Sequence, residues 1–116
     1  MDIEEVQKKV IEFRDARDWE QYHNPKDLAI SLMLEAAELL EIFQWKDAEE
    51  VEAIKSDPEN RRRVKEELGD VLIYALNMCH AFRFDPAKVV LQKLAINEDK
   101  YPVEKSKGSA KKYTET

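Results

Sequence analysis

Three Asx–Pro pairs divide this chain and set where its helices can begin. Asn24-Pro25, Asp57-Pro58 and Asp85-Pro86 each place a side-chain oxygen at a helix N-cap and a proline at the first helical position. Apolar residues at helical spacing follow each pair, and no segment shows the alternation typical of a strand. The sequence therefore predicts an all-α chain.

The apolar spacing predicts four main helices and a short one. The main helices run from about residue 2 to 17, 25 to 43, 58 to 82 and 86 to 101, and the short helix from about residue 47 to 56. Helix 25–43 is apolar on more than one side, which indicates burial on two sides. We expect residues 1–102 to form a four-helix bundle that oligomerises, and residues 103–116 to form a polar, flexible tail.

The composition excludes several classes of protein. A chain of 116 residues fits one domain, and its net charge of −6 argues against binding to a nucleic-acid polymer. No apolar run approaches membrane-spanning length, and the N-terminal residues do not resemble a secretion leader. The single Cys79 cannot form an internal disulfide. We expect a soluble, cytoplasmic protein.

Two predicted helices carry acidic pairs inside apolar runs. Glu35 and Glu38 lie three residues apart, as do Glu67 and Asp70, so each pair projects from one face of its helix. With 25 acidic residues in the chain, such spacing is common on solvated faces, and only the apolar neighbours make these pairs unusual. If the two helices pack together, four carboxylates converge and repel one another. A hard cation such as Mg²⁺, or Mn²⁺, would relieve that repulsion.

Two further observations bear on the metal. A di-iron bundle would carry a Glu-x-x-His motif on each of two helices, whereas only His23 follows a glutamate, Glu20, by three residues, and His80 does not. Gly69 lies inside the second acidic motif, where a helix tolerates glycine if close packing or a site requires it. The oxygen-only ligand set therefore favours Mg²⁺.

Aromatic residues lie just outside the two acidic helices. Trp19, Tyr22, His23 and Trp45 could stack on a nucleobase, although packing in the core is the more ordinary role for Tyr22 and His23. Tyr74 stands one turn beyond Asp70 on the same helix face. Its hydroxyl could bind a sugar or phosphate, or it could be an ordinary core tyrosine.

Basic and polar residues gather near the C-terminal end. Lys93, Asn97 and Lys100 form a row on the last main helix, and Lys112 is one of several lysines in the tail. Such groups suit a phosphate, although each lysine by itself is typical of a solvated surface.

Five motifs together resemble the MazG-like nucleotide pyrophosphohydrolases, and within them the dCTP pyrophosphatase branch. They are Arg17-Asp-Trp-Glu-Gln-Tyr-His-Asn-Pro, Glu35-Ala-Ala-Glu-Leu-Leu-Glu-Ile-Phe-Gln-Trp-Lys, Glu66-Glu-Leu-Gly-Asp-Val-Leu-Ile-Tyr, Asp99-Lys-Tyr-Pro and Lys111-Lys-Tyr-Thr-Glu. One departure is Ala37, which stands where many members carry Gly.

The resemblance implies an enzyme that hydrolyses nucleoside triphosphates, with dCTP or related dNTPs as substrates, to the monophosphate and pyrophosphate. It implies a homodimer or homotetramer with the pocket near the subunit interface. The implied site residues are Glu35, Glu38, Glu67 and Asp70 for Mg²⁺, Glu38 as the catalytic base, Trp19 and Trp45 for the base, Tyr74 and Asn97 for the sugar or phosphate, and Lys93, Lys100 and Lys112 for the pyrophosphate. The alternative is a non-enzymatic helical interaction domain whose acids are only solvated.

Overall fold

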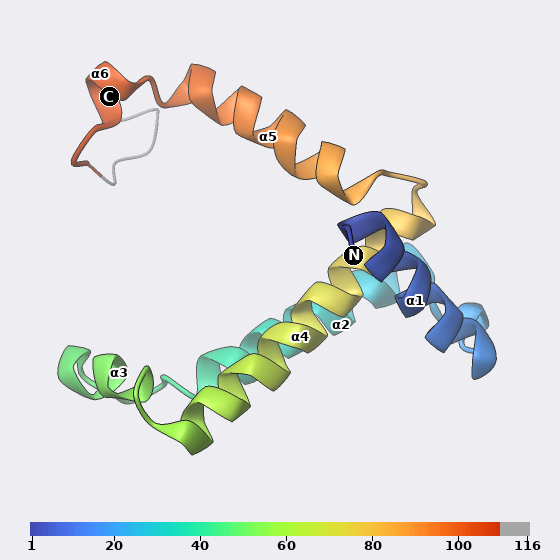
Figure 1. Ribbon diagram of the computed structural model, residues 1–116, viewed down its shortest axis with the longest axis horizontal. Coiled ribbons are helices and arrows are strands. Elements are labelled where there is room, and N and C mark those ends of the chain that lie inside the picture. Colours follow the sequence, from blue (N-terminus) through green and yellow to red (C-terminus); the bar gives the residue numbers. More distant parts are fainter. Residues whose placement is uncertain (110–116) are drawn as a thin grey trace.

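The computed structural model describes residues 1–109, which contain helices and no strand, so the prediction of an all-α fold is confirmed. The elements are α1 (Ile3–Ala16), a 3-10 turn η1 (Glu20–Tyr22), α2 (Pro25–Glu41), α3 (Ala48–Ile54), α4 (Pro58–Ala81), α5 (Pro86–Lys100) and α6 (Val103–Ser106) (Figure 1). Among these residues, no helix combines the length and the hydropathy needed to cross a membrane.

The helices begin where the Asx–Pro pairs predict. The side chains of Asn24, Asp57 and Asp85 each accept a hydrogen bond from a backbone N–H of the first turn, and a proline follows each of them. Asp47 and Glu50 form a reciprocal capping box at the start of α3. These contacts satisfy N–H groups that have no partner within the helix. Local sequence therefore fixes the helix starts.

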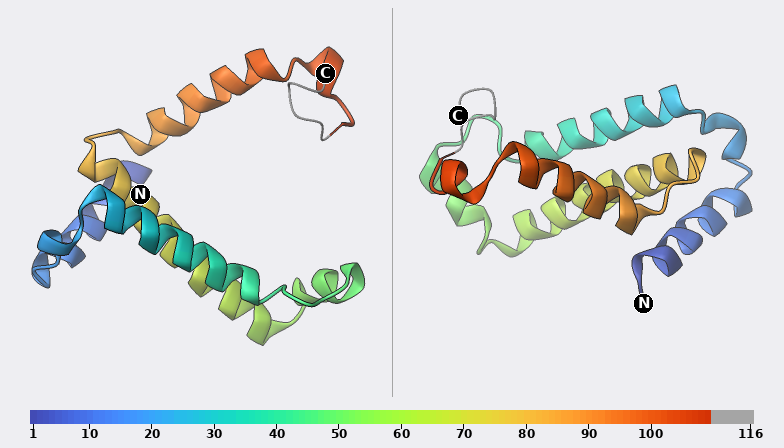
Figure 2. Two further views of the ribbon diagram at one scale, coloured as in Figure 1. Left: turned by 180° about the vertical axis from the view of Figure 1, so that it is seen from behind. Right: turned by 90° about the horizontal axis from the view of Figure 1, so that it is seen from above.

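An antiparallel pair of helices forms the centre of the fold. α2 and α4 lie side by side along most of their lengths, and α1 packs across α4 near the end of the pair (Figure 2). The buried hydrophobic side chains of the described residues are Leu28, Ile42, Ile54 and Leu76. This small core lies mainly along the α2–α4 contact, and it holds the two acidic motifs opposite each other.

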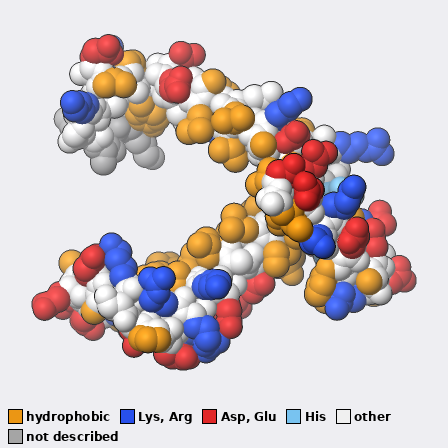
Figure 3. Space-filling view, in the orientation of Figure 1, with side chains coloured by type: hydrophobic (Ala, Val, Ile, Leu, Met, Phe, Trp, Pro, Cys, Tyr) orange, Lys and Arg blue, Asp and Glu red, His pale blue; other side chains and the backbone are white. Residues whose placement is uncertain are grey.

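Helix α5 stands away from that pair. The chain turns after α4, with Arg83 in a left-handed conformation (φ 58°), and α5 then contacts mainly α1. Hydrophobic side chains line α5 and the side of the α2–α4 pair that faces it across an open angle (Figure 3). Leu91 and Leu94 are 64% and 52% exposed. The radius of gyration is 17.4 Å, whereas a compact chain of this length has about 13 Å.

One chain therefore does not close the expected four-helix bundle by itself. The predicted tail begins with the short helix α6 and continues to Ser109. Residues 110–116, which include Lys112, lie outside the described part of the chain.

Candidate functional site

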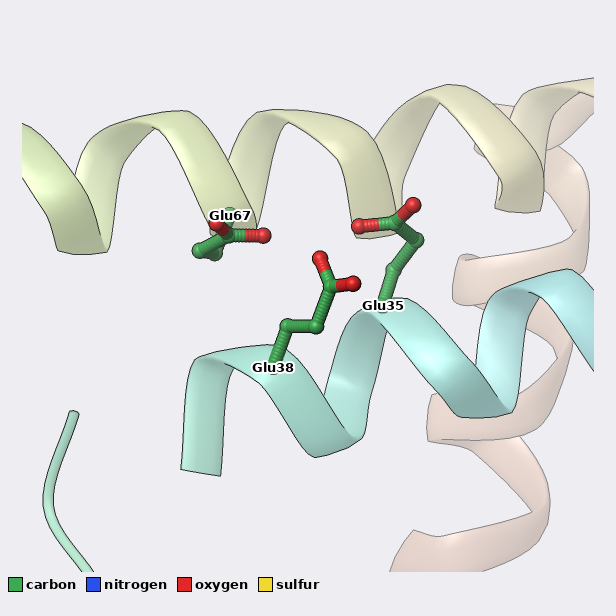
Figure 4. A group of neighbouring side chains, drawn as sticks. All are labelled: Glu35, Glu38 and Glu67. Carbon is green, nitrogen blue, oxygen red and sulfur yellow. The ribbon is translucent and has the colours of Figure 1, made fainter. Parts of the chain in front are cut away.

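Three carboxylates meet between the two central helices. Glu35 and Glu38 come from α2 and Glu67 comes from α4, and one oxygen of each lies within 4.8 Å of the others. Figure 4 shows the three side chains pointing toward one another in the space between the helices. The i, i+3 spacing of Glu35 and Glu38 brings both to this face, because three residues make nearly one helical turn.

This group of carboxylates lacks a positive partner among the described residues. Oε2 of Glu35 and Oε2 of Glu67 are buried and have no hydrogen-bond partner there. Burial, followed by hydrogen bonding and repulsion from Glu38, raises the pKa of Glu35 to about 7. Burial is also the main cause that raises the pKa of Glu67. The cluster therefore holds a proton near neutrality, or needs a cation in place of it.

Asp70 lies next to the three glutamates without belonging to the closest group. Its charge contributes to the raised pKa of both Glu35 and Glu67. The four predicted carboxylates thus act on one another, although three of them form the tight set. Oxygen donors with two unpartnered buried atoms fit a hard divalent cation such as Mg²⁺ or Mn²⁺.

An aromatic pocket adjoins the acidic cluster. Its volume is about 230 Å³, and its lining consists of Trp19, Tyr22, His23, Asp27, Leu28, Ser31 and Tyr74. Tyr74 lies one turn beyond Asp70 on α4, and Ser31 lies one turn before Glu35 on α2. The pocket therefore borders the carboxylates along both helices. Its volume equals that of about eight water molecules, which gives room for one heterocyclic ring.

The structure brings together some predicted nucleotide contacts and separates others. Trp19 and Tyr74 share the aromatic pocket. Trp45 does not reach it, because it follows the far end of α2, where it is 92% exposed and has a left-handed backbone (φ 66°). Lys93, Asn97 and Lys100 lie on α5, which stands away from the α2–α4 pair (Figure 1).

The pocket also contains polar residues that the sequence analysis did not assign to a site. Asp27 and Ser31 line it beside His23, and the sequence offered a signal for them. Asp27, Ser31 and Glu35 follow one another at intervals of four residues, so they form a polar stripe on a mostly apolar helix.

Comparisons with known proteins show the family of this chain. A family model described as MazG-like matches residues 30–116. The chain is 42% identical over 113 residues to dCTP pyrophosphatase 1 of Bos taurus and 40% identical to dCTP pyrophosphatase 1 of Homo sapiens. Both alignments cover 97% of this chain, and it spans 67% and 66% of the two relatives.

A solved structure is also similar. The crystal structure of a pyrophosphatase from Archaeoglobus fulgidus DSM 4304 matches with a TM-score of 0.78 and 45% sequence identity, over 86% of this chain and 92% of that one. The family model covers most of the chain, including both acidic motifs. The chain therefore belongs to the MazG-like family.

Proposed function

We propose that this protein hydrolyses deoxynucleoside triphosphates, dCTP or closely related dNTPs, to the monophosphate and pyrophosphate in the presence of Mg²⁺. The observation that carries the proposal is the cluster of Glu35, Glu38 and Glu67, with two buried, unpartnered oxygens, beside an aromatic pocket. The mammalian relatives named dCTP pyrophosphatase 1 and the archaeal pyrophosphatase support the reaction class.

The carboxylates have two roles in the proposed reaction, metal binding and proton transfer. Glu35, Glu38, Glu67 and Asp70 are the residues that would hold Mg²⁺, and a bound divalent cation supplies positive charge against the triphosphate and acidifies water. Glu38 is our candidate for the base that accepts the proton of the attacking water, because it lies between the other two glutamates and is exposed. Attack in line at the α-phosphorus then releases pyrophosphate.

The aromatic pocket is placed to receive the base of the same nucleotide. Trp19 contributes a partly exposed ring to its lining, and Tyr74 lines it one turn beyond Asp70 on α4. A base in the pocket leaves the sugar and phosphates to extend along α2 and α4 toward the glutamates. This arrangement positions the α-phosphorus by binding energy that is remote from the reacting bond.

We further propose that a second copy of the chain completes the site. Trp45, Lys93, Asn97 and Lys100 lie too far along the fold to join the aromatic pocket of their own chain. The exposed apolar side chains of α5, such as Leu91 and Leu94, favour packing against a partner in a homodimer or homotetramer. Such packing would bring these residues to the partner's nucleotide.

The reaction is tested by its products and by isotope position. With Mg²⁺, dCTP should yield dCMP and pyrophosphate, and hydrolysis in ¹⁸O water should place the label in dCMP. Label in pyrophosphate would mean attack at the β-phosphorus, and release of dCDP with orthophosphate would refute the proposal. Chelation of divalent cations by EDTA should abolish the reaction. Hydrolysis that continues in EDTA would mean that the acids are merely solvated and hold no required metal.

Mixing two variants that are both impaired at low dCTP tests the shared site. Suppose that the acids and the tryptophan of each site come from different chains. A dimer of one Glu38→Gln chain and one Trp45→Ala chain then has one site with both defects and one site with neither. Activity at low dCTP should therefore rise when the two variants are mixed and allowed to exchange subunits. If both residues act within one chain, every site keeps a defect and mixing restores nothing.

A further inference from the structure

An apolar groove lies between α3 and the first half of α4. Its volume is about 740 Å³, and its apolar lining consists of Phe43, Val51, Ile54, Val64 and Leu68. Ile54 is buried, whereas Leu68 is 43% exposed. An exposed apolar surface with a polar rim is typical of a site where another element packs. We call this surface the α3–α4 groove.

Two cations on the rim of the α3–α4 groove have no acidic partner among the described residues. They are Arg61 and Lys65, whereas Lys55 and Arg62 on the same rim pair with nearby glutamates. Arg61 donates a hydrogen bond to the backbone carbonyl of Lys55 at 2.8 Å, which does not neutralise its charge. An occupant that combines apolar side chains with a carboxylate therefore complements the groove.

Helix α5 carries such a combination on one face. Leu91, Leu94 and Glu98 follow one another at intervals of three and four residues, so they form one stripe along the helix. All three side chains are exposed. Glu98 takes part in no ion pair within residues 1–109. The stripe is thus two apolar side chains followed by an unpaired carboxylate.

The spacing of the stripe agrees with the spacing of the groove. Leu91 and Glu98 are seven positions apart on α5, as are Arg61 and Leu68 on α4. Each interval spans about 10.5 Å, because an α-helix rises 1.5 Å per residue. If the two helices lie antiparallel, Leu91 faces Leu68, and Glu98 then faces Arg61. A parallel arrangement would instead bring the carboxylate to Leu68.

Helix α5 of the same chain does not provide this register. It leaves from the end of α4 that is far from α3, and it contacts mainly α1 (Figure 1). If it folded back on its own α4, Pro86 would lie level with Ala81, and Glu98 would lie level with Gly69. That level is eight positions, or about 12 Å, from Arg61. The register therefore requires the α5 of another chain.

We propose that the α3–α4 groove of one copy holds helix α5 of a second copy, antiparallel to α4, with Leu91 on Leu68 and Glu98 on Arg61. In a two-fold dimer this contact occurs twice, because each copy offers one groove and one α5. The inference rests on the proposed function in so far as a second copy completes each site, and it adds the surface on which that copy docks.

The same register brings α5 of the second copy to the acidic group. Lys93 of that copy lies level with Glu66, the residue before Glu67 on α4. The acidic group has no positive partner among the described residues of its own chain. Docking therefore delivers a cation to the level of α4 where the carboxylates are concentrated.

Charge reversal in two separate chains tests the docking. Glu98→Arg and Arg61→Glu should each weaken self-association by about tenfold or more, because like charges then meet in the groove. An equal mixture of the two variants should recover the wild-type mass, because each groove of a mixed dimer again meets an opposite charge. Light scattering over a series of protein concentrations measures both effects.

Two matched variants control for the change in net charge. Asp99→Arg alters the residue next to Glu98, outside the stripe, and Arg63→Glu alters the first turns of α4 outside the groove lining. Both should keep the wild-type mass. The docking is overturned if Glu98→Arg and Arg61→Glu also keep it, or if their mixture recovers nothing. A wild type that is monomeric at all concentrations would overturn it too, and would assign the groove to a different partner.

An engineered disulfide measures the register directly. In a Cys79→Ser background, the pair Leu68→Cys and Leu91→Cys should give a covalent dimer on oxidation, because facing side chains meet the geometry of a disulfide. The pair Ile73→Cys and Leu91→Cys is the control, since Ile73 does not line the groove. A covalent dimer in the control pair alone would overturn the register.

The dCTP assay separates this proposal from the proposed function. A protein that hydrolyses dCTP but fails the mixing and disulfide tests would overturn the docking alone. Dimers that pass both tests and release no dCMP would refute the function and leave the docking in place.

Discussion

The α2–α4 pair is packed within one chain, whereas helix α5 is left largely uncovered. In the pair, two helices bring Glu35, Glu38 and Glu67 together and enclose most of the small core. α5 has equally regular capping, yet Leu91 and Leu94 on it are more than half exposed. The same kind of local signal thus produced a packed element and an unpacked one. Helix formation and helix placement are therefore separate problems.

The largest expected effect concerns the packed pair. Glu38→Gln should reduce kcat for dCTP hydrolysis by about 10²–10⁴-fold, the range typical for loss of a general base. Rapid quenching with separation of dCMP measures it. Glu41→Gln is the control, because Glu41 is exposed on the same helix outside the acidic group. A variant with near-normal kcat would show that Glu38 is not the base.

A substitution on helix α5 should affect assembly first. Leu94→Glu places a charge on the exposed apolar surface of α5, which we expect to pack against a partner, so it should dissociate the oligomer and lower activity at low protein concentration. Light scattering should report a multiple of 13.6 kDa for the wild type and a smaller mass for the variant. Gln92→Glu, at a polar position of the same helix, should keep the wild-type mass. A monomeric wild type would remove the basis of the comparison.

Trp45 connects the two regions, because it is exposed at the end of α2 and is expected to contact a partner's nucleotide. Trp45→Ala should raise KM by about tenfold or more with less change in kcat, since stacking on a base is worth about 1–3 kcal/mol and is similar in ground and transition states. Steady-state kinetics with dCTP separates the two parameters. A large fall in kcat at constant KM would instead assign Trp45 to the position of the phosphates.

Metal should stabilise the pair more than α5. At a Mg²⁺ concentration one hundred times Kd, the melting temperature should rise by on the order of 10 °C, because a ligand that binds only the folded state stabilises it by mass action. Differential scanning calorimetry measures the shift. Asp70→Asn should show a smaller shift and a higher metal-free melting temperature, because repulsion among the acids is reduced. An unchanged wild-type curve would contradict a metal site.

The smallest effect is the pH dependence of the metal-free protein. A pKa of Glu35 raised to about 7, from an ordinary value of 4.5, means that the folded chain binds this proton more tightly than the unfolded chain. The contribution to stability is then complete below pH 4.5 and lost as the pH rises through about 7. Melting curves in EDTA should show this decline, and Glu35→Gln should flatten it. The same decline in both proteins would assign it to another group.

The sequence alone determined the helices and the residue types of the site. Asx–Pro caps act within one turn, and i, i+3 spacing fixes which carboxylates share a helix face, so Glu35 with Glu38 and Glu67 with Asp70 could be paired before any contact was known. Resemblance to the MazG-like family supplied the reaction class. These features depend on interactions between residues that are close in sequence.

Only the tertiary structure decided how these local pieces combine. It placed Glu67 in the tight group beside Glu35 and Glu38 while Asp70 acts from outside, it joined Trp19 to Tyr74 and it separated both from Trp45. It also set α5 apart from the α2–α4 pair, which the amphipathic spacing of α5 did not predict. An apolar stripe shows that a helix must be covered, but it does not show whether the same chain or another chain covers it.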